Sequence, residues 1–390
     1  MKRSPLFLIS FIILAFQFSE ALPKFATRQG AKCQSCHINP TGKGMRSTFG
    51  STYGREELPM ASYKEATDID EYSPALNDFF TVGMDYRTLF FYREQSSSSS
   101  FFQMQGDLYL DLRLNKKFRI YIDKGLYSGF EVFGLAKVLP LDGYVKIGNF
   151  VPSYGLKMDD HTLFTRSGQE YSTNPGVIQG IGASATGLNY PKGLGFGQGN
   201  EDTGLEVGFN PSIFTINIGV FNGMNGGRGG AVDKQTKAVV VRADANIQTD
   251  VVNFNIGGSV YNLPTDGGPG KTQILGAFGV ISYDNNLTLQ GEYDMITTHN
   301  SSAPLNRLVT GNILYLEANY LLSNGIDLKF GYEFYDPNLN RKDGSATRYT
   351  IGAELFPLTG VEIRPLYRIN QENPTDFKNN ELHVMFHFYL

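Results

Sequence analysis

Along most of this chain, apolar and polar side chains alternate at every second residue, which is the pattern of a β-strand with two unlike faces. Residues 118–123 read Phe-Arg-Ile-Tyr-Ile-Asp, and residues 326–335 continue the same alternation over a longer stretch. Segments of about ten residues with this pattern are typical of transmembrane β-strands, in which one face meets lipid and the other lines the interior. The alternation begins near residue 77 and continues to the C-terminus.

This alternation predicts an all-β fold, an outer-membrane β-barrel of about 16 antiparallel strands. The predicted strands are residues 79–92, 100–114, 117–127, 129–138, 143–151, 203–210, 213–221, 237–247, 250–261, 272–283, 286–296, 310–321, 325–335, 347–356, 360–369 and 380–390. An even number of strands places both ends of the barrel on the periplasmic side.

The connections between the predicted strands agree with a barrel, since outer-membrane barrels have short periplasmic turns and longer extracellular loops. From the eighth strand onward, tight turns alternate with longer polar loops at 262–271, 297–309, 336–346 and 370–379. The connection 152–202 is much longer than the others and rich in glycine. Long loops of this kind are often functional, and we expect it to enter the lumen, to cover the segment before the barrel, or both.

A soluble β-sandwich is the alternative fold, because its strands are amphipathic as well. Sixteen consecutive strands are too many for one sandwich, and no linker divides them into two. Leu382, Val384, Phe386 and Phe388 also share a face that runs to the terminal Leu390, as in barrels delivered to the outer membrane. We therefore predict that residues 77–390 form a porin-like barrel in the lipid bilayer of a Gram-negative-type outer membrane. The net charge of −4 gives no indication of nucleic-acid binding.

Residues 1–21 have the parts of a secretory signal peptide. Lys2 and Arg3 are followed by an apolar stretch at 6–16, and Ser19-Glu20-Ala21 offers small residues at a cleavage site. We expect the signal to be removed, so that the mature chain begins near Leu22 outside the cytoplasm. An uncleaved N-terminal anchor is the alternative.

The chain has two cysteines, and both lie in the sequence Cys33-Gln34-Ser35-Cys36-His37. C-x-x-C-H is the attachment signature of c-type haem: the two thiols form thioethers with the macrocycle, and the adjacent imidazole ligates the iron. A redox-active dithiol and half of a zinc site are the alternatives, although no second cysteine pair completes the zinc site. We predict one haem c, attached to Cys33 and Cys36 and ligated by His37.

We assign residues 22–76 to this haem-binding segment and expect one short helix in it, with Met45, Phe49 and Tyr53 on its apolar face. The second axial ligand of the iron stays open. Met45 and Met60 are candidates within the segment, and His161 is a candidate in the long connection. Packing roles for both methionines and a five-coordinate iron are the alternatives.

Two histidines, His383 and His387, fall on the polar face of the last predicted strand. We expect them to line the lumen rather than to bind a metal.

The haem-binding segment is basic, with six Lys and Arg and no Asp or Glu between residues 22 and 55. These bases are either partners for the haem propionates or a solvated face. Alternation directs several acidic residues into the lumen: Glu206, Glu292, Glu333, Glu354 and Glu362. We expect the basic segment to be drawn into this lumen and to plug it. The alternative is a segment that stays in the periplasm and docks a periplasmic cytochrome.

An export signal, a C-x-x-C-H motif soon after it and a barrel of this size together resemble the fused outer-membrane cytochrome–porins. The residues from Phe25 to Gly30 are similar to that family's lead-in to the motif. The resemblance implies a haem held by Cys33, Cys36 and His37. It also implies electron transfer across the outer membrane, between a periplasmic cytochrome and an extracellular redox partner such as ferrous iron. A diffusion porin with a structural haem, or a barrel that sheathes a separate multihaem cytochrome, are the alternative functions.

Overall fold

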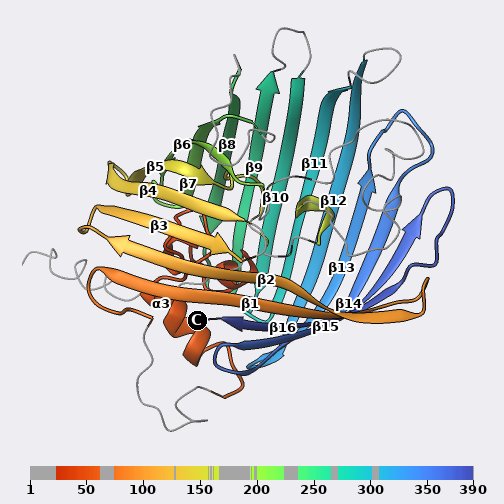
Figure 1. Cartoon of the computed structure of the whole chain (residues 1–390), viewed down its shortest axis with the longest axis horizontal. Coiled ribbons are helices and arrows are strands. Elements are labelled where there is room, and N and C mark those ends of the chain that lie inside the picture. The colour runs from red at the N-terminus through yellow and green to blue at the C-terminus, as the bar shows by residue number, and fades with distance from the viewer. Residues whose placement is uncertain are drawn as a thin grey trace, which may run out of the picture.

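The computed structural model of the chain is a closed antiparallel β-barrel, in which sixteen strands are formed by the described residues (Figure 1). Each strand pairs with its neighbours in the sequence, and β1 closes the ring by pairing with β16. The structure describes residues 23–61, 74–126, 129–156, 158, 160, 162–166, 194, 196, 200–223, 236–264, 271–300 and 307–389. The fold class predicted from the alternation is confirmed. The predicted signal peptide, residues 1–21, lies outside the described residues.

The strands are β1 (Phe80–Arg93), β2 (Ser98–Arg113), β3 (Phe118–Gly125), β4 (Phe130–Leu139), β5 (Gly143–Phe150), β6 (Asp202–Phe209), β7 (Phe214–Phe221), β8 (Ala238–Ile247), β9 (Val252–Pro264), β10 (Lys271–Tyr283), β11 (Leu287–Asn300), β12 (Arg307–Ser323), β13 (Ile326–Asp336), β14 (Ala346–Leu358), β15 (Val361–Glu372) and β16 (Glu381–Tyr389). Each overlaps one predicted strand. β9, β11, β12 and β15 extend further toward the long loops than predicted. In β11 and β15, backbone pairing continues past the last apolar residue, and side-chain alternation cannot detect this.

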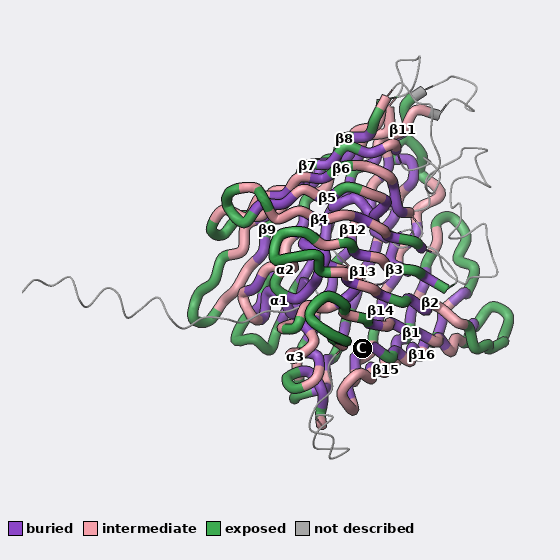
Figure 2. Tube along the Cα trace, turned by 60° about the vertical axis from the view of Figure 1, so that its left-hand side comes forward, coloured by how far each residue is buried: buried purple, intermediate pink, exposed green. Residues whose placement is uncertain are grey.

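Buried and exposed residues alternate along the strands (Figure 2). The exposed strand residues are largely apolar and many of the buried ones are polar, so the wall has an apolar outer face and a largely polar inner face. On β12, Leu316 and Tyr320 are each 47% exposed, whereas Glu317 and Asn319 between them are buried. The five glutamates predicted to point inward, Glu206, Glu292, Glu333, Glu354 and Glu362, are all buried. Such a continuous apolar exterior is unfavourable in water and suits contact with lipid.

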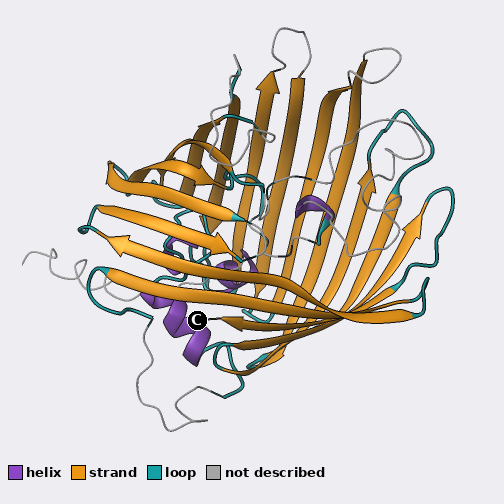
Figure 3. Ribbon diagram, in the orientation of Figure 1, coloured by secondary structure: helices purple, strands orange, loops and turns teal. Residues whose placement is uncertain are grey.

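In the described residues 23–61, three short helices precede the barrel, where the sequence predicted one: α1 (Pro23–Arg28), α2 (Cys33–Cys36) and α3 (Thr48–Glu56) (Figure 3). The predicted helix corresponds to α3. Met45 lies before it, so its place on the expected apolar face is wrong, whereas Tyr53 does pack against the apolar side chain of Phe25. A Cβ at Gly50 would collide with the carbonyl oxygen of Cys36, so glycine lets α3 pack closely on α2. None of the helices in the described ranges is long and apolar enough to cross a membrane.

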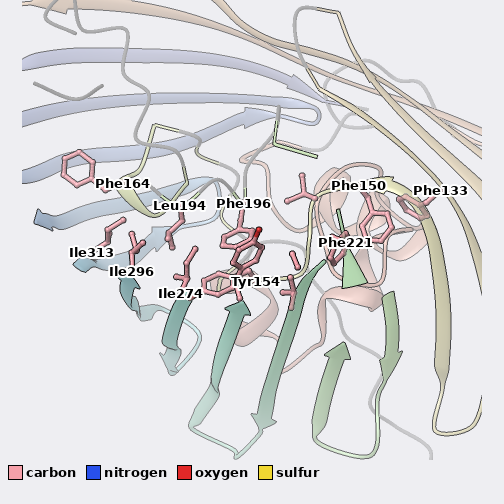
Figure 4. Close-up of a cluster of buried hydrophobic side chains, with 14 of the residues drawn as sticks. Phe133, Phe150, Tyr154, Phe164, Leu194, Phe196, Phe221, Ile274, Ile296 and Ile313 are labelled. Atoms are coloured by element: carbon pink, nitrogen blue, oxygen red, sulfur yellow. The ribbon is translucent and has the colours of Figure 1, made fainter. Parts of the chain in front are cut away.

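Apolar and aromatic side chains form a cluster inside the barrel (Figure 4). Part of it comes from the long connection between β5 and β6. The ring of Tyr154 stacks on that of Phe196, with centroids 4.3 Å apart, and Phe196 contacts Tyr261 of β9 edge-on at 5.5 Å. The η2 turn (Phe164–Arg166) of the same connection contacts β12 and β13. The described parts of the long connection therefore lie in the lumen, as the sequence predicted.

Candidate haem-binding site at the barrel mouth

The C-x-x-C-H motif forms one helical turn followed by an extended residue. Cys33 and Cys36 are the first and last residues of α2, so their side chains leave the same face of the turn. His37 has φ −114° and ψ 149°, and its backbone N–H donates to the Cys33 carbonyl over 3.1 Å. The chain then doubles back, because His37 and Arg46 pair in an isolated antiparallel bridge.

The imidazole of His37 is oriented by the loop that follows it. Its Nδ1 lies 3.3 Å from the carbonyl oxygen of Gly44, and the side chain is nearly buried. Metal-ligating histidines usually donate one ring N–H to such a carbonyl, which fixes the tautomer whose other nitrogen carries the lone pair. Gly44 has a φ of +68°, and a Cβ at this position would collide with the hydroxyl of Tyr121. Glycine at this position therefore lets the loop supply the carbonyl.

Two cavities border the motif. The larger one has about 900 Å³ of space between its atoms, part of which is open solvent. We call it the seam cavity because Asp85 of β1 and His387 of β16, the two strands that close the barrel, line it together with His37. The smaller cavity, of about 510 Å³, is bordered by Cys33. Cys36 is fully buried.

The walls of the seam cavity combine apolar rings with bases. Phe25, Leu58, Phe356 and Tyr389 form a compact apolar cluster, and all four line the cavity. Three cationic side chains, Lys43, Arg46 and Arg364, line it together with the carboxylates of Asp85 and Glu362. Apolar surface for a macrocycle and cations for its propionates are what a haem requires. The rings, the bases and His37 suit a haem, whereas Cys33 borders the smaller cavity and Cys36 is fully buried. Among the described residues, this cavity included, no group of three or more His, Cys, Asp or Glu is placed to hold a metal ion.

Two of the three candidates for the second axial ligand, Met45 and Met60, do not line this cavity. Met45 is buried in the lumenal cluster, and its backbone N–H donates to the Tyr121 hydroxyl over 3.0 Å. Met60 is 45% exposed, and its N–H donates to the Phe356 carbonyl over 2.8 Å. His161 lies outside the described residues.

Buried ion pairs hold α1 against the inner wall of the barrel. Lys24 Nζ lies 2.5 Å from Glu354 Oε2 and 3.2 Å from Asp327 Oδ2. Arg28 makes two hydrogen bonds to Asp327, of 3.0 and 2.9 Å, and donates a third to Thr288. Removing one partner of such a buried pair typically costs about 3–5 kcal/mol. These contacts place the start of the segment inside the lumen.

The rest of the segment is attached to the short turns at one end of the barrel. Lys32 Nζ donates to the carbonyls of Ser212 and Phe214, and Gln34 donates to Asp142 over 2.9 Å. At the other side of the mouth, Thr359 donates to the Arg55 carbonyl over 2.7 Å. Partial burial lowers the pKa of Lys32, although Asp244 and Asp142 oppose this shift. The C-terminus lies at this same end, beside α3 (Figure 1).

The described parts of the long connection between β5 and β6 contact the inner wall of the barrel through further ion pairs and a hydrogen bond. Arg166 pairs with Glu292 at 2.7 Å, and the Phe164 N–H donates to Glu333 over 2.7 Å. Asp160 lies 3.4 Å from Arg368. Burial alone would raise the pKa of Asp160, but the charges of Arg368, Arg364 and Lys329 outweigh it and hold that pKa well below its usual value.

The segment and the long connection approach each other in the lumen. Lys24 of α1 and Asp160 of the connection line one cavity of about 290 Å³. The inward glutamates are paired rather than free: Glu206 with Lys146, Glu292 with Arg166, Glu333 with Arg348, Glu354 with Lys24 and Glu362 with Arg364. The expectation of an openly acidic lumen therefore needs correction. Bases on the wall, on α1 and in the connection neutralise these acids.

Comparison with known proteins gives information on the fold. No protein-family model matches the sequence, and no curated protein matches it. Among solved structures, the barrel is similar to OmpT of Vibrio cholerae with loop L8 deleted (TM-score 0.53, 12% identity, covering 80% of this chain and 100% of that one). It is also similar to OprB of Pseudomonas putida (TM-score 0.55, 11% identity, 80% and 94%) and to Salmonella typhi OmpF (TM-score 0.53, 12% identity, 80% and 97%). The chain thus has the barrel fold of outer-membrane porins.

Proposed function

We propose that this protein passes electrons across the outer membrane of a Gram-negative-type cell through one covalently bound haem c at the mouth of a porin-like barrel. The observation that carries the proposal is the position of Cys33, Cys36 and His37. The motif lies on a segment that is fixed inside the barrel by Lys24 and Arg28. The resemblance to the fused cytochrome–porins supports the same function.

The residues of the segment have distinct roles in this proposal. Cys33 and Cys36 form the thioethers, His37 ligates the iron, and Lys43 and Arg46 pair with the propionates. When bound, the haem supplies a one-electron carrier. α1 and the described parts of the long connection lie in the lumen and keep water and ions away from the carrier. The short-turn end faces a periplasmic cytochrome, and the opposite end faces an extracellular redox partner, with ferrous iron as the donor that the family resemblance implies.

The outer-membrane location rests on the apolar exterior as well as on the fold. Replacing Leu316 with arginine puts a charge on the outward face near the middle of β12, the tenth of its seventeen residues. At the bilayer midplane this is expected to cost about 2–4 kcal/mol. The free energy of unfolding, measured by urea titration in lipid vesicles, tests the location.

The matched control is the same substitution at Leu339, which is also 47% exposed but lies beyond the end of β13. Leu339→Arg is expected to leave the free energy of unfolding almost unchanged. A lipid-facing Leu316 would be contradicted if both variants were destabilised equally. It would also be contradicted if neither variant were destabilised.

A diffusion porin with a structural haem is the second candidate, and the porin-like fold supports it. This function, like that of a sheath around another cytochrome, requires an open lumen. The contacts of α1 and of the long connection with the inner wall weigh against both.

Electron transfer across the membrane of sealed vesicles tests the proposed function. The purified protein is reconstituted into liposomes that contain reduced methyl viologen, with ferric citrate outside, and oxidation of the dye is followed by absorbance. Wild-type protein is expected to oxidise the dye well above the rate of protein-free liposomes. The Cys33→Ser, Cys36→Ser double variant, which keeps the barrel, is the matched control and is expected to fall to that background. Equal rates for the two proteins would exclude transfer through the haem.

A further inference from the structure

Two imidazoles border the seam cavity from parts of the chain that are far apart in sequence. His37 belongs to the N-terminal segment, and His387 belongs to the last strand. A row of contacts connects them around the cavity wall. His37 pairs with Arg46, the Arg46 guanidinium lies 4.0 Å from the centre of the Tyr389 ring, and that ring lies 5.1 Å from the His387 ring.

Carboxylates hold the ring of His387 from both sides. Its Nδ1 lies 2.7 Å from Glu362 Oε2, and its Nε2 lies 3.1 Å from Asp85 Oδ2. Metal-ligating histidines are commonly held by a carboxylate at the nitrogen that does not bind the metal. The Glu362 contact supplies this arrangement and directs the other nitrogen of His387 toward β1.

Other residues of the cavity are less suited to ligate iron. Met84 of β1 lines the cavity, but it is only half-buried, and its neighbour Asp85 is the residue that alternation places on the inner face. Tyr109 is buried in the lumenal aromatic cluster. His387 is therefore the side chain on the barrel wall of this cavity with a nitrogen suited to a haem iron.

We infer that His387 is the second axial ligand of the haem iron, opposite His37, with Glu362 as the acceptor that orients it. The inference rests on the proposed function and names a ligand that the sequence did not indicate. Ligation uses the lone pair of Nε2, so the ring keeps its proton on Nδ1 and donates it to Glu362. Asp85 then loses its contact with the imidazole and keeps its 2.8 Å pair with Arg87.

Electron paramagnetic resonance and visible spectra of the purified, full-length ferric protein test this ligand. Wild-type protein is expected to be low-spin, with the signature of two imidazole ligands. His387→Ala is expected to convert the haem fully to high-spin, and added imidazole is expected to restore the low-spin spectrum. Rescue by free imidazole distinguishes a lost ligand from a general structural defect.

His383→Ala is the matched control. His383 lies on the same inner face of β16 and also contacts a glutamate, with Nε2 3.1 Å from Glu381, but it does not line the seam cavity. This variant is expected to stay low-spin. Should His387→Ala fold poorly, His387→Met preserves the side-chain volume and is expected to give a histidine–methionine spectrum instead. Glu362→Gln is expected to stay low-spin with a more positive midpoint potential, because a neutral acceptor makes the imidazole a weaker donor.

Two results would overturn the inference while the proposed function stands. One is a haem protein in which His387→Ala or His387→Met keeps the wild-type spectrum. The other is a high-spin spectrum of His383→Ala equal to that of His387→Ala, since loss of either residue would then act through the fold. A wild-type protein without covalent haem would overturn both the inference and the proposed function.

Discussion

Replacing both Cys33 and Cys36 with serine is expected to abolish covalent haem attachment completely, because both thioether sulfurs are lost. The expected result is a barrel in the outer-membrane fraction that gives no haem stain on a denaturing gel and no pyridine haemochrome spectrum. The substitutions lie on the single turn of α2, away from the strand pairs, so the barrel is expected to assemble.

His37→Ala separates attachment from ligation. It keeps both sulfurs, so the haem stain is expected to persist while the visible spectrum and midpoint potential change with the loss of the axial nitrogen. Haem stain that persists at full strength in the double serine variant would refute the haem assignment. A wild-type protein that lacks haem and forms a reversible Cys33–Cys36 disulfide would instead support the redox-dithiol alternative.

Releasing the N-terminal segment from the lumen is expected to open the barrel to ions. Deletion of residues 22–76 behind the export signal removes α1, α2 and α3 together, and Lys24→Ala with Arg28→Ala removes the buried ion pairs in a full-length chain. Barrels of about 16 strands leave an aqueous channel when nothing fills them. Single-channel conductance in planar bilayers is therefore expected to rise from near background toward that of an open porin.

Lys32→Ala is the control for this experiment, because Lys32 contacts turn carbonyls at the rim rather than the inner wall. It is expected to leave conductance near the wild-type level. The long connection stays in place in all these variants, with Arg166 on Glu292, and is expected to set the remaining constriction. Conductance that is the same with and without residues 22–76 would show that the segment does not obstruct the pore.

The strands were predictable because each is specified by its own side-chain alternation. Outward Leu316 and inward Glu317, for example, are neighbours in the sequence and need no partner to be assigned. The C-x-x-C-H motif is equally local. Strand ends were less accurate, as at β12, which begins at Arg307 instead of residue 310. Backbone hydrogen bonding decides those ends, and it has little dependence on side-chain polarity.

Many contacts around the candidate site were not predictable, since they join residues far apart in the sequence, such as Lys24 and Glu354, which are 330 positions apart. Lys24 meets Glu354, and His387 meets the cavity of His37, only once the barrel is closed. One signal was overlooked. The alternation that directs glutamates inward also directs Lys146, Arg348 and Arg364 inward, and all three are buried. Counting them would have indicated a lumen of paired charges.

The seam between β1 and β16 has a consequence for how the protein matures. The seam cavity takes Asp85 from β1 and His387 from β16, so its walls are complete only when the first and last strands pair. In the closed barrel Cys36 is fully buried, and α1 contacts β9, β10 and β11, which are synthesised after it. Under the proposed function, the haem therefore has to be attached to the two thiols while the chain is still open in the periplasm. Attachment would then precede membrane insertion, and a chain that closed first would stay without its cofactor.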